Sequence, residues 1–110
     1  MTQFQDREKA FEKKFAHDAE LKFKAESRRN KALAEWAGAR MGISGAELDD
    51  YVKAVRKADL AEKGDDDVFR KVKGDLEAKG KGVSDDELRR TMVDLLAKAV
   101  ADVEGEAKRS

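Results

Sequence analysis

The feature that most constrains the fold of this chain is the absence of proline, combined with glycines that interrupt otherwise continuous stretches. Proline breaks a helix, and a glycine in the left-handed conformation commonly ends one. Gly42, Gly64 and the Gly80–Gly82 loop divide the chain into four segments, which are filled mainly by strong helix formers such as Ala, Lys, Glu and Leu. The sequence therefore predicts an all-α fold with four helices.

Two helix starts are marked by local sequence signals. Ser44 and Ser84 are each followed three residues later by a glutamate, Glu47 and Glu87, which is the pattern of a capping box. The acidic run 65–67 follows Gly64 and is expected to cap the third helix and to place negative charge at the positive end of the helix dipole, which stabilises the helix. A metal site in this run is disfavoured because no spaced partner ligands follow it.

Apolar residues at helical spacing indicate which faces form the core. In the second half of the first helix they are Phe23, Leu33, Trp36, Ala37 and Met41. In the next two helices they are Leu48, Tyr51, Val52, Val55 and Ala58, and then Val68, Phe69, Val72 and Leu76. In the last helix they are Leu88, Met92, Leu95, Leu96, Ala99, Val100 and Val103. Four amphipathic helices with short connections predict a four-helix bundle.

The beginning of the chain is too polar for such a bundle. Between Phe4 and Phe15 the large apolar residues are Phe4, Phe11 and Phe15, and charged residues occupy most other positions. Two interpretations follow: the stripe packs on its own bundle, or it is disordered alone and becomes helical in a groove on a partner protein. We predict a mobile helical arm at residues 1–19, a four-helix domain at residues 20–105 and a disordered tail at residues 106–110.

Composition disfavours several classes of function. The chain has 24 basic and 24 acidic residues, so no net field draws it to nucleic acid or to an anionic membrane. There is no cysteine, and His17 is the single histidine, which removes thiol chemistry and histidine-based metal sites and predicts a protein that is not an enzyme. His17 is either a pH-sensitive group or an ordinary solvated side chain. No signal peptide and no apolar run of about 18 residues is present, which predicts a cytoplasmic protein without membrane insertion.

The run DREKAFEKKFAHDAELKFKAESRRNK, with Trp36-Ala37 and the later run Gly64–Lys71, resembles the zeta subunit of alphaproteobacterial F-type ATP synthases, a family of ATPase inhibitors. The resemblance extends over nearly the whole chain. Departures are Ser27, where a small apolar residue is expected, and the composition of the Gly80–Gly82 loop.

This resemblance implies a protein that is monomeric when free and binds the catalytic head of the synthase, which contains the α, β and γ subunits. Its N-terminal segment would enter a catalytic α/β interface as a helix and block rotation in the hydrolytic direction. The residues that would contact the synthase are Phe4, Arg7, Lys9, Phe11, Lys13, Lys14 and Phe15. The bound protein would be peripheral to the inner membrane.

The resemblance also implies ADP or ATP as a ligand of the bundle, and no other cofactor. No GxxxxGK[ST] loop exists, so a nucleotide site would consist of surface cations and an aromatic ring. The candidates are Lys24, Arg28, Arg29, Lys31 and Trp36. The alternative function is a generic helical interaction or nucleotide-sensing module without a synthase role. A helix-turn-helix for nucleic acid is disfavoured because the acidic run 65–67 would face phosphates.

Overall fold

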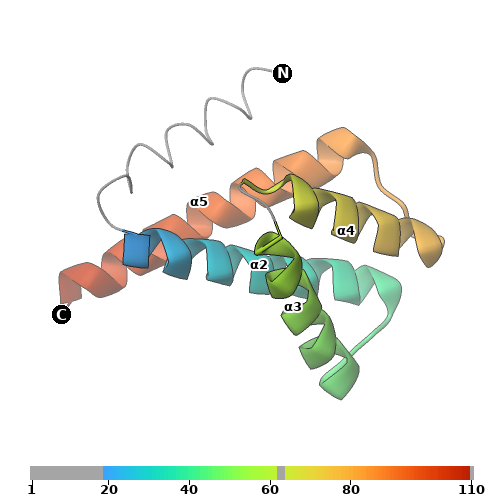
Figure 1. The fold of residues 1–110 in the computed structure, drawn as a ribbon, viewed down its shortest axis with the longest axis horizontal. Helices are drawn as coiled ribbons and strands as arrows, with labels where there is room; N and C mark the ends of the chain where they lie inside the picture. Colours follow the sequence, from blue (N-terminus) through green and yellow to red (C-terminus); the bar gives the residue numbers. More distant parts are fainter. Residues whose placement is uncertain (1–18, 62–63, 110) are drawn as a thin grey trace.

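The structure is a computed structural model that describes residues 19–61 and 64–109. These residues form four helices and no strand (Figure 1): α2 (Ala19–Met41), α3 (Gly45–Asp59), α4 (Asp66–Ala78) and α5 (Asp85–Arg109). The prediction of an all-α, four-helix fold is confirmed for this part of the chain. Residues 1–18 of the predicted arm, which include His17, lie outside the described residues, and Ala19 begins α2. At the other end, α5 continues beyond the boundary predicted at residue 105.

Gly42 and Gly80 follow the ends of α2 and α4 as predicted, whereas α3 already ends at Asp59, five residues before Gly64, with Leu60 as its C-cap. Gly42, Gly64 and Gly80 have φ values of 77°, 87° and 69°, in the left-handed region that favours glycine. After α4, the N–H of Lys81 donates to the carbonyl of Leu76 at 2.9 Å, which reaches back across Gly80 as in a Schellman motif. These turns let consecutive helices fold back on one another with short connections.

The two predicted capping boxes differ in the structure. At the start of α5, the backbone N–H of Glu87 donates to the Ser84 hydroxyl at 3.1 Å. Ser44 also precedes a helix, but its side chain makes no capping hydrogen bond. Gly45 has a left-handed backbone with φ of 61°, so the first turn of α3 is irregular and lacks the geometry of a capping box.

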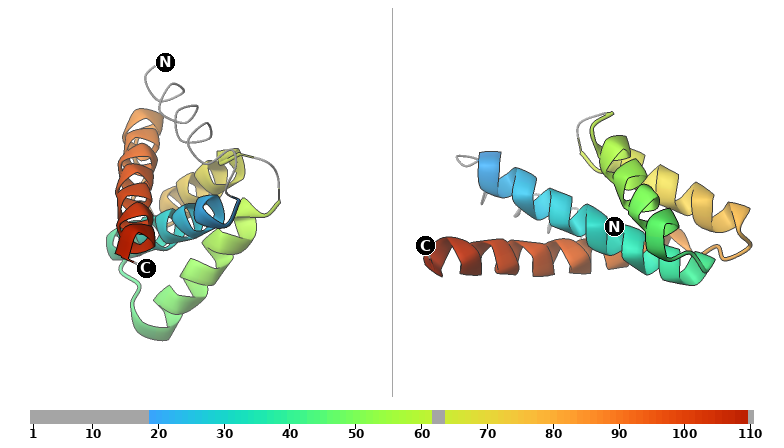
Figure 2. Two further views of the ribbon diagram at one scale, coloured as in Figure 1. Left: turned by 90° about the vertical axis from the view of Figure 1, so that its left-hand side faces the viewer. Right: turned by 90° about the horizontal axis from the view of Figure 1, so that it is seen from below.

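Helix α2 is the centre of the arrangement, because it contacts α3, α4 and α5. Helix α5 runs antiparallel along the length of α2, and α3 crosses α2 at a steep angle (Figures 1 and 2). The larger buried cluster joins all four helices and contains Leu33, Ala34, Ala37, Val52, Val55, Val68, Val72, Leu76, Leu88 and Met92. A smaller cluster joins only α2 and α5 and contains Ala25, Leu96, Ala99 and Val103.

Phe23 is not a core residue, in contrast to its predicted role. Its side chain is 63% exposed, whereas Ala25 and Leu33 on the same helix are fully buried. Small residues on the buried face of α2 allow α5 to approach closely, and Phe23 lies off that face. The phenylalanine therefore remains available on the surface.

Candidate functional site

The seven residues predicted to contact the synthase lie between Phe4 and Phe15, outside the described residues. The structure therefore does not place them. None of the described helices has the length and apolarity needed to cross a membrane.

The five residues predicted for nucleotide binding all lie on α2, and none of them lines either of the two hollows described below. Lys24 forms an ion pair with Glu20 at 3.4 Å, and Arg28 forms one with Glu106 of α5 at 2.5 Å. Both cations are thus occupied by carboxylates of this chain. Lys31 is exposed, and no described residue forms an ion pair with it.

Arg29 differs from the other four because it is buried, with 2% of its surface exposed. Its Nε donates to Asn30 Oδ1 at 2.7 Å, and one terminal nitrogen lies 3.5 Å from Asp65. Asn30 in turn donates to Asp59 at 2.9 Å, and Arg89 of α5 contacts Asp65 at 3.1 Å. A buried guanidinium requires such partners, so Arg29 serves as a cross-link between α2 and the ends of α3 and α4.

Trp36 is half-buried and packs against the larger cluster, as expected for a core residue. The guanidinium of Arg40 lies 4.5 Å from the centre of its ring, in cation–π geometry. Arg40 also forms an ion pair with Glu87 at 3.3 Å. One face of the indole is therefore already covered by a side chain of this protein.

The acidic run before α4 has a role that the sequence did not predict. Asp65 takes the N-cap position, but its side chain makes no capping hydrogen bond and accepts from arginines instead. Arg89 also donates to Asp66 at 2.7 Å, and its guanidinium carbon lies 4.1 Å from the centre of the Phe69 ring. Asp67 forms an ion pair with Arg70. Asp65 and Asp66 therefore fix the start of α4 to α5 by ion pairs, whereas the Asp67 pair lies within α4.

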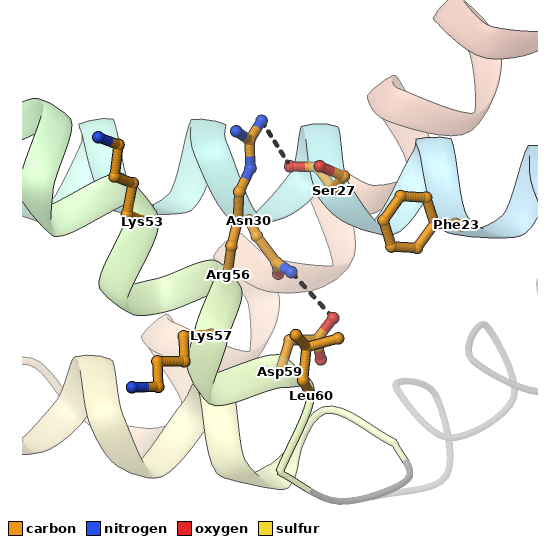
Figure 3. Close-up of a pocket in the computed structure, with 8 residues that line it drawn as sticks. All are labelled: Phe23, Ser27, Asn30, Lys53, Arg56, Lys57, Asp59 and Leu60. Atoms are coloured by element: carbon orange, nitrogen blue, oxygen red, sulfur yellow. Dashed lines mark hydrogen bonds between the residues drawn. The ribbon is translucent and has the colours of Figure 1, made fainter.

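A groove of about 310 Å³ lies between α2 and α3, and we call it the α2–α3 groove. Its lining residues are Phe23, Ser27, Asn30, Lys53, Arg56, Lys57, Asp59 and Leu60 (Figure 3). Phe23 and Leu60 are the exposed large apolar residues among those that the structure describes, at 63% and 77% exposure. In Figure 3, Lys53 and Lys57 lie at one end of the groove and Phe23 at the other.

Sequence reasoning missed the α2–α3 groove. The apolar spacing predicts Phe23 in the core, and it does not single out Lys53, Arg56 and Lys57, which lie away from the apolar face of their helix. One available signal was Leu60, a large apolar residue directly after the last turn of α3, off the helical pattern that defines its buried face. The other half of the groove comes from a distant part of the chain.

A second hollow, of about 380 Å³, lies at the other side of α3 and is bordered by α4. The Tyr51 hydroxyl is buried there, and no hydrogen-bond partner satisfies it among the described residues. Lys71 lies 5.6 Å from the centre of the Tyr51 ring and 3.1 Å from Asp75. Burial, and then the neighbouring Asp75 carboxylate, raises the pKa of the Tyr51 phenol well above its ordinary value.

Comparison with known proteins identifies the family of this chain. No curated protein matches the chain. Residues 1–102 match the family described as ATPase inhibitor subunit zeta, a match that includes all of α2, α3 and α4 and most of α5. Because this match extends over nearly the whole chain and the fold is the expected one, the chain belongs to the ATPase inhibitor subunit zeta family.

Proposed function

We propose that this protein inhibits ATP hydrolysis by the F-type ATP synthase by inserting its N-terminal segment, as a helix, into a catalytic α/β interface. The observation that supports this proposal is the family match, which begins at residue 1 and therefore includes the segment with the phenylalanine stripe. Helix-in-groove binding suits that segment, because three phenylalanines supply apolar anchors and the surrounding charges supply pairing groups.

In this proposal the protein is a regulator without catalytic activity of its own, and the bundle presents the N-terminal segment to the synthase. Phe11 and Phe15 are the anchors, and Arg7, Lys9, Lys13 and Lys14 pair with acidic groups of the head. Phe4 extends the stripe by two turns. The protein is cytoplasmic and becomes peripheral to the inner membrane when it is bound.

The decisive experiment measures ATP hydrolysis by the cognate synthase head with increasing amounts of inhibitor. The full chain is compared with a version lacking residues 1–18, which keeps every described helix, and with a Phe11→Ala, Phe15→Ala double variant. We expect inhibition by the full chain, none by the shortened version and at least tenfold weaker inhibition by the double variant. A Lys98→Ala variant, altered at an exposed position of α5, serves as the control. Equal inhibition by the full and shortened chains would refute the proposal.

Binding of ADP or ATP to the bundle is the second proposal, and it concerns regulation. At the predicted residues a nucleotide would have to displace the carboxylates that pair with Lys24, Arg28 and Arg29, or use Lys31 and the exposed part of Trp36. An ADP titration followed by amide chemical shifts and by Trp36 fluorescence tests it. Unchanged signals at millimolar ADP would remove nucleotide regulation and leave the inhibitor function intact.

A further inference from the structure

The α2–α3 groove combines exposed apolar side chains with a row of cations, and the N-terminal segment does not account for it. We propose that this groove binds an acidic amphipathic helix of the synthase head, as a second contact that holds the bundle against the head. This inference rests on the inhibitor function proposed above. It assigns to the bundle a binding role in addition to presenting the N-terminal segment.

The apolar part of the groove provides the first argument. Phe23 and Leu60 are far apart in sequence, yet they line the same groove, and both are more than half exposed. Exposed aromatic and aliphatic side chains beside a hollow are typical anchors of a protein interface. The volume of about 310 Å³ accommodates an aliphatic side chain of a partner between them.

The cations provide the second argument. No described residue forms an ion pair with Lys53, Arg56 or Lys57, and Arg56 donates to the Ser27 carbonyl at 3.5 Å. By contrast, Arg28 and Arg40 are paired with glutamates of this chain. Lys53 and Lys57 are one helical turn apart, about 6 Å along the axis, which matches two carboxylates at positions i and i+4 of a partner helix.

The position of the groove on α3 favours spaced carboxylates over a compact polyphosphate. The three cations belong to the second half of α3, where the helix dipole is negative, and Asp59 adds a carboxylate to the lining. Among the described lining residues, none belongs to a helix N-terminus or a glycine-rich loop that could supply backbone N–H groups. A dense negative charge would therefore lack the donors it needs, whereas two separate carboxylates each require one cation.

The protein's own N-terminal segment is a poorer match for the groove. Residues 1–18 contain four acidic and four basic residues, so the segment offers no excess negative charge to the cation row. A partner helix with glutamates or aspartates on one face satisfies both the cations and the apolar pair. This charge complementarity selects an acidic helix of the head as the occupant.

The test measures the affinity of the full chain for the isolated synthase head at low and high salt. The variants are Phe23→Ala with Leu60→Ala, and Lys53→Glu with Lys57→Glu. Both variants alter exposed side chains, so the bundle should fold normally, which circular dichroism checks. We expect about tenfold weaker binding for each, with a weaker salt dependence for the charge variant and with full inhibition retained at saturating protein.

A Lys81→Glu, Lys98→Glu variant makes the same change in net charge at exposed positions away from the groove, and its affinity should stay within about twofold of the original. Normal inhibition with unchanged affinity in both groove variants would overturn the groove proposal alone. Absence of inhibition by the original chain would instead refute the inhibitor function. A parallel ADP titration that shifts the amides of Phe23, Lys53 and Leu60 would assign the groove to a nucleotide and would also overturn the acidic-helix proposal.

Discussion

Arg29 shows how a single residue can be misjudged when its neighbours along the chain are the only guide. In the sequence it stands next to Arg28 in a basic run, where both suit a phosphate site equally well. In the structure, Arg28 lies at the surface with Glu106, whereas Arg29 is buried with Asn30 and Asp65. The first is a surface ion pair of small energetic value, and the second is a structural cross-link.

The two adjacent arginines therefore provide a matched prediction for stability. Replacing Arg29 by alanine leaves Asp65 without one of its two cationic partners inside the protein, so we expect the free energy of unfolding to fall by about 3 kcal/mol. Replacing Arg28 by alanine removes an exposed pair and should cost less than about 1 kcal/mol. Urea denaturation measures both, and equal losses would show that Arg29 is not the cross-link described.

Tyr51 supplies a prediction about pH. Its folded-state pKa is raised above the unfolded value of about 10, so the folded protein retains the phenolic proton more tightly than the unfolded chain. The stability of the fold is therefore unaffected by this group below about pH 10 and decreases above it, as the unfolded chain loses the proton first.

The measurement compares urea denaturation at about pH 8 and about pH 11 for the original chain and for Tyr51→Phe. The original chain should lose more stability than the variant between the two pH values, and lysine titration affects both alike. Because Tyr51 is the single tyrosine, its ionisation can also be followed directly by ultraviolet absorbance. An ordinary titration near pH 10 in the folded protein would contradict the burial described.

At the scale of the helices, glycine has two distinct roles within α4 and its end. Gly74 lies inside the helix, and a Cβ atom built on it meets nothing within 4 Å. Gly80 follows the helix with φ of 69°, in a conformation that costs an L-residue about 1–2 kcal/mol. Replacement of glycine by alanine should therefore change the free energy of unfolding in opposite directions at the two sites.

We expect Gly74→Ala to raise the free energy of unfolding by about 0.5–1 kcal/mol and Gly80→Ala to lower it by about 1 kcal/mol. Thermal denaturation of the two variants beside the original chain is sufficient to measure this. A destabilising effect at Gly74 would mean that this face of α4 is not open as described.

Local signals in the sequence were enough to locate the helices but not to orient them. Gly80 and Ser84 mark their boundaries through backbone conformation and capping, which depend on a few neighbouring residues. The exposure of Phe23 and the burial of Arg29 depend instead on which side of α2 faces α5. That choice is made by packing between distant segments, and α2 has polar residues on its buried face, so helical spacing alone favoured the wrong side for Phe23.

The candidate site was predictable to an even smaller extent. Its cations on α3 are visible in the sequence, but Phe23 is 30 or more residues away and joins them only when α3 crosses α2. The N-terminal anchors came from the family resemblance, since a stripe of phenylalanines does not identify its partner. Apolar spacing thus specified the bundle, whereas the surface that binds partners depends on tertiary arrangement.

At the scale of the whole molecule, the two buried clusters predict two levels of protection from hydrogen exchange. Val103 belongs to the smaller cluster, and Val72 belongs to the larger one. Val103→Ala should accelerate exchange in the first turns of α2 and the last turns of α5, leaving the slowest amides unchanged, because only the smaller cluster loses packing. Val72→Ala should accelerate the slowest amides throughout the bundle. Identical exchange patterns for the two variants would show that the clusters unfold as one unit.

The unequal size of the clusters has a mechanical consequence. A pulling force applied at Ala19, where the described part of the chain begins, acts first on the turns of α2 that pack on α5 through the smaller cluster. These turns can separate from α5 while the larger cluster, which includes Leu33, holds the rest of α2 against the other helices. Under load, the first turns of α2 can therefore unfold and extend the N-terminal end of the bundle, while the rest of the bundle stays folded.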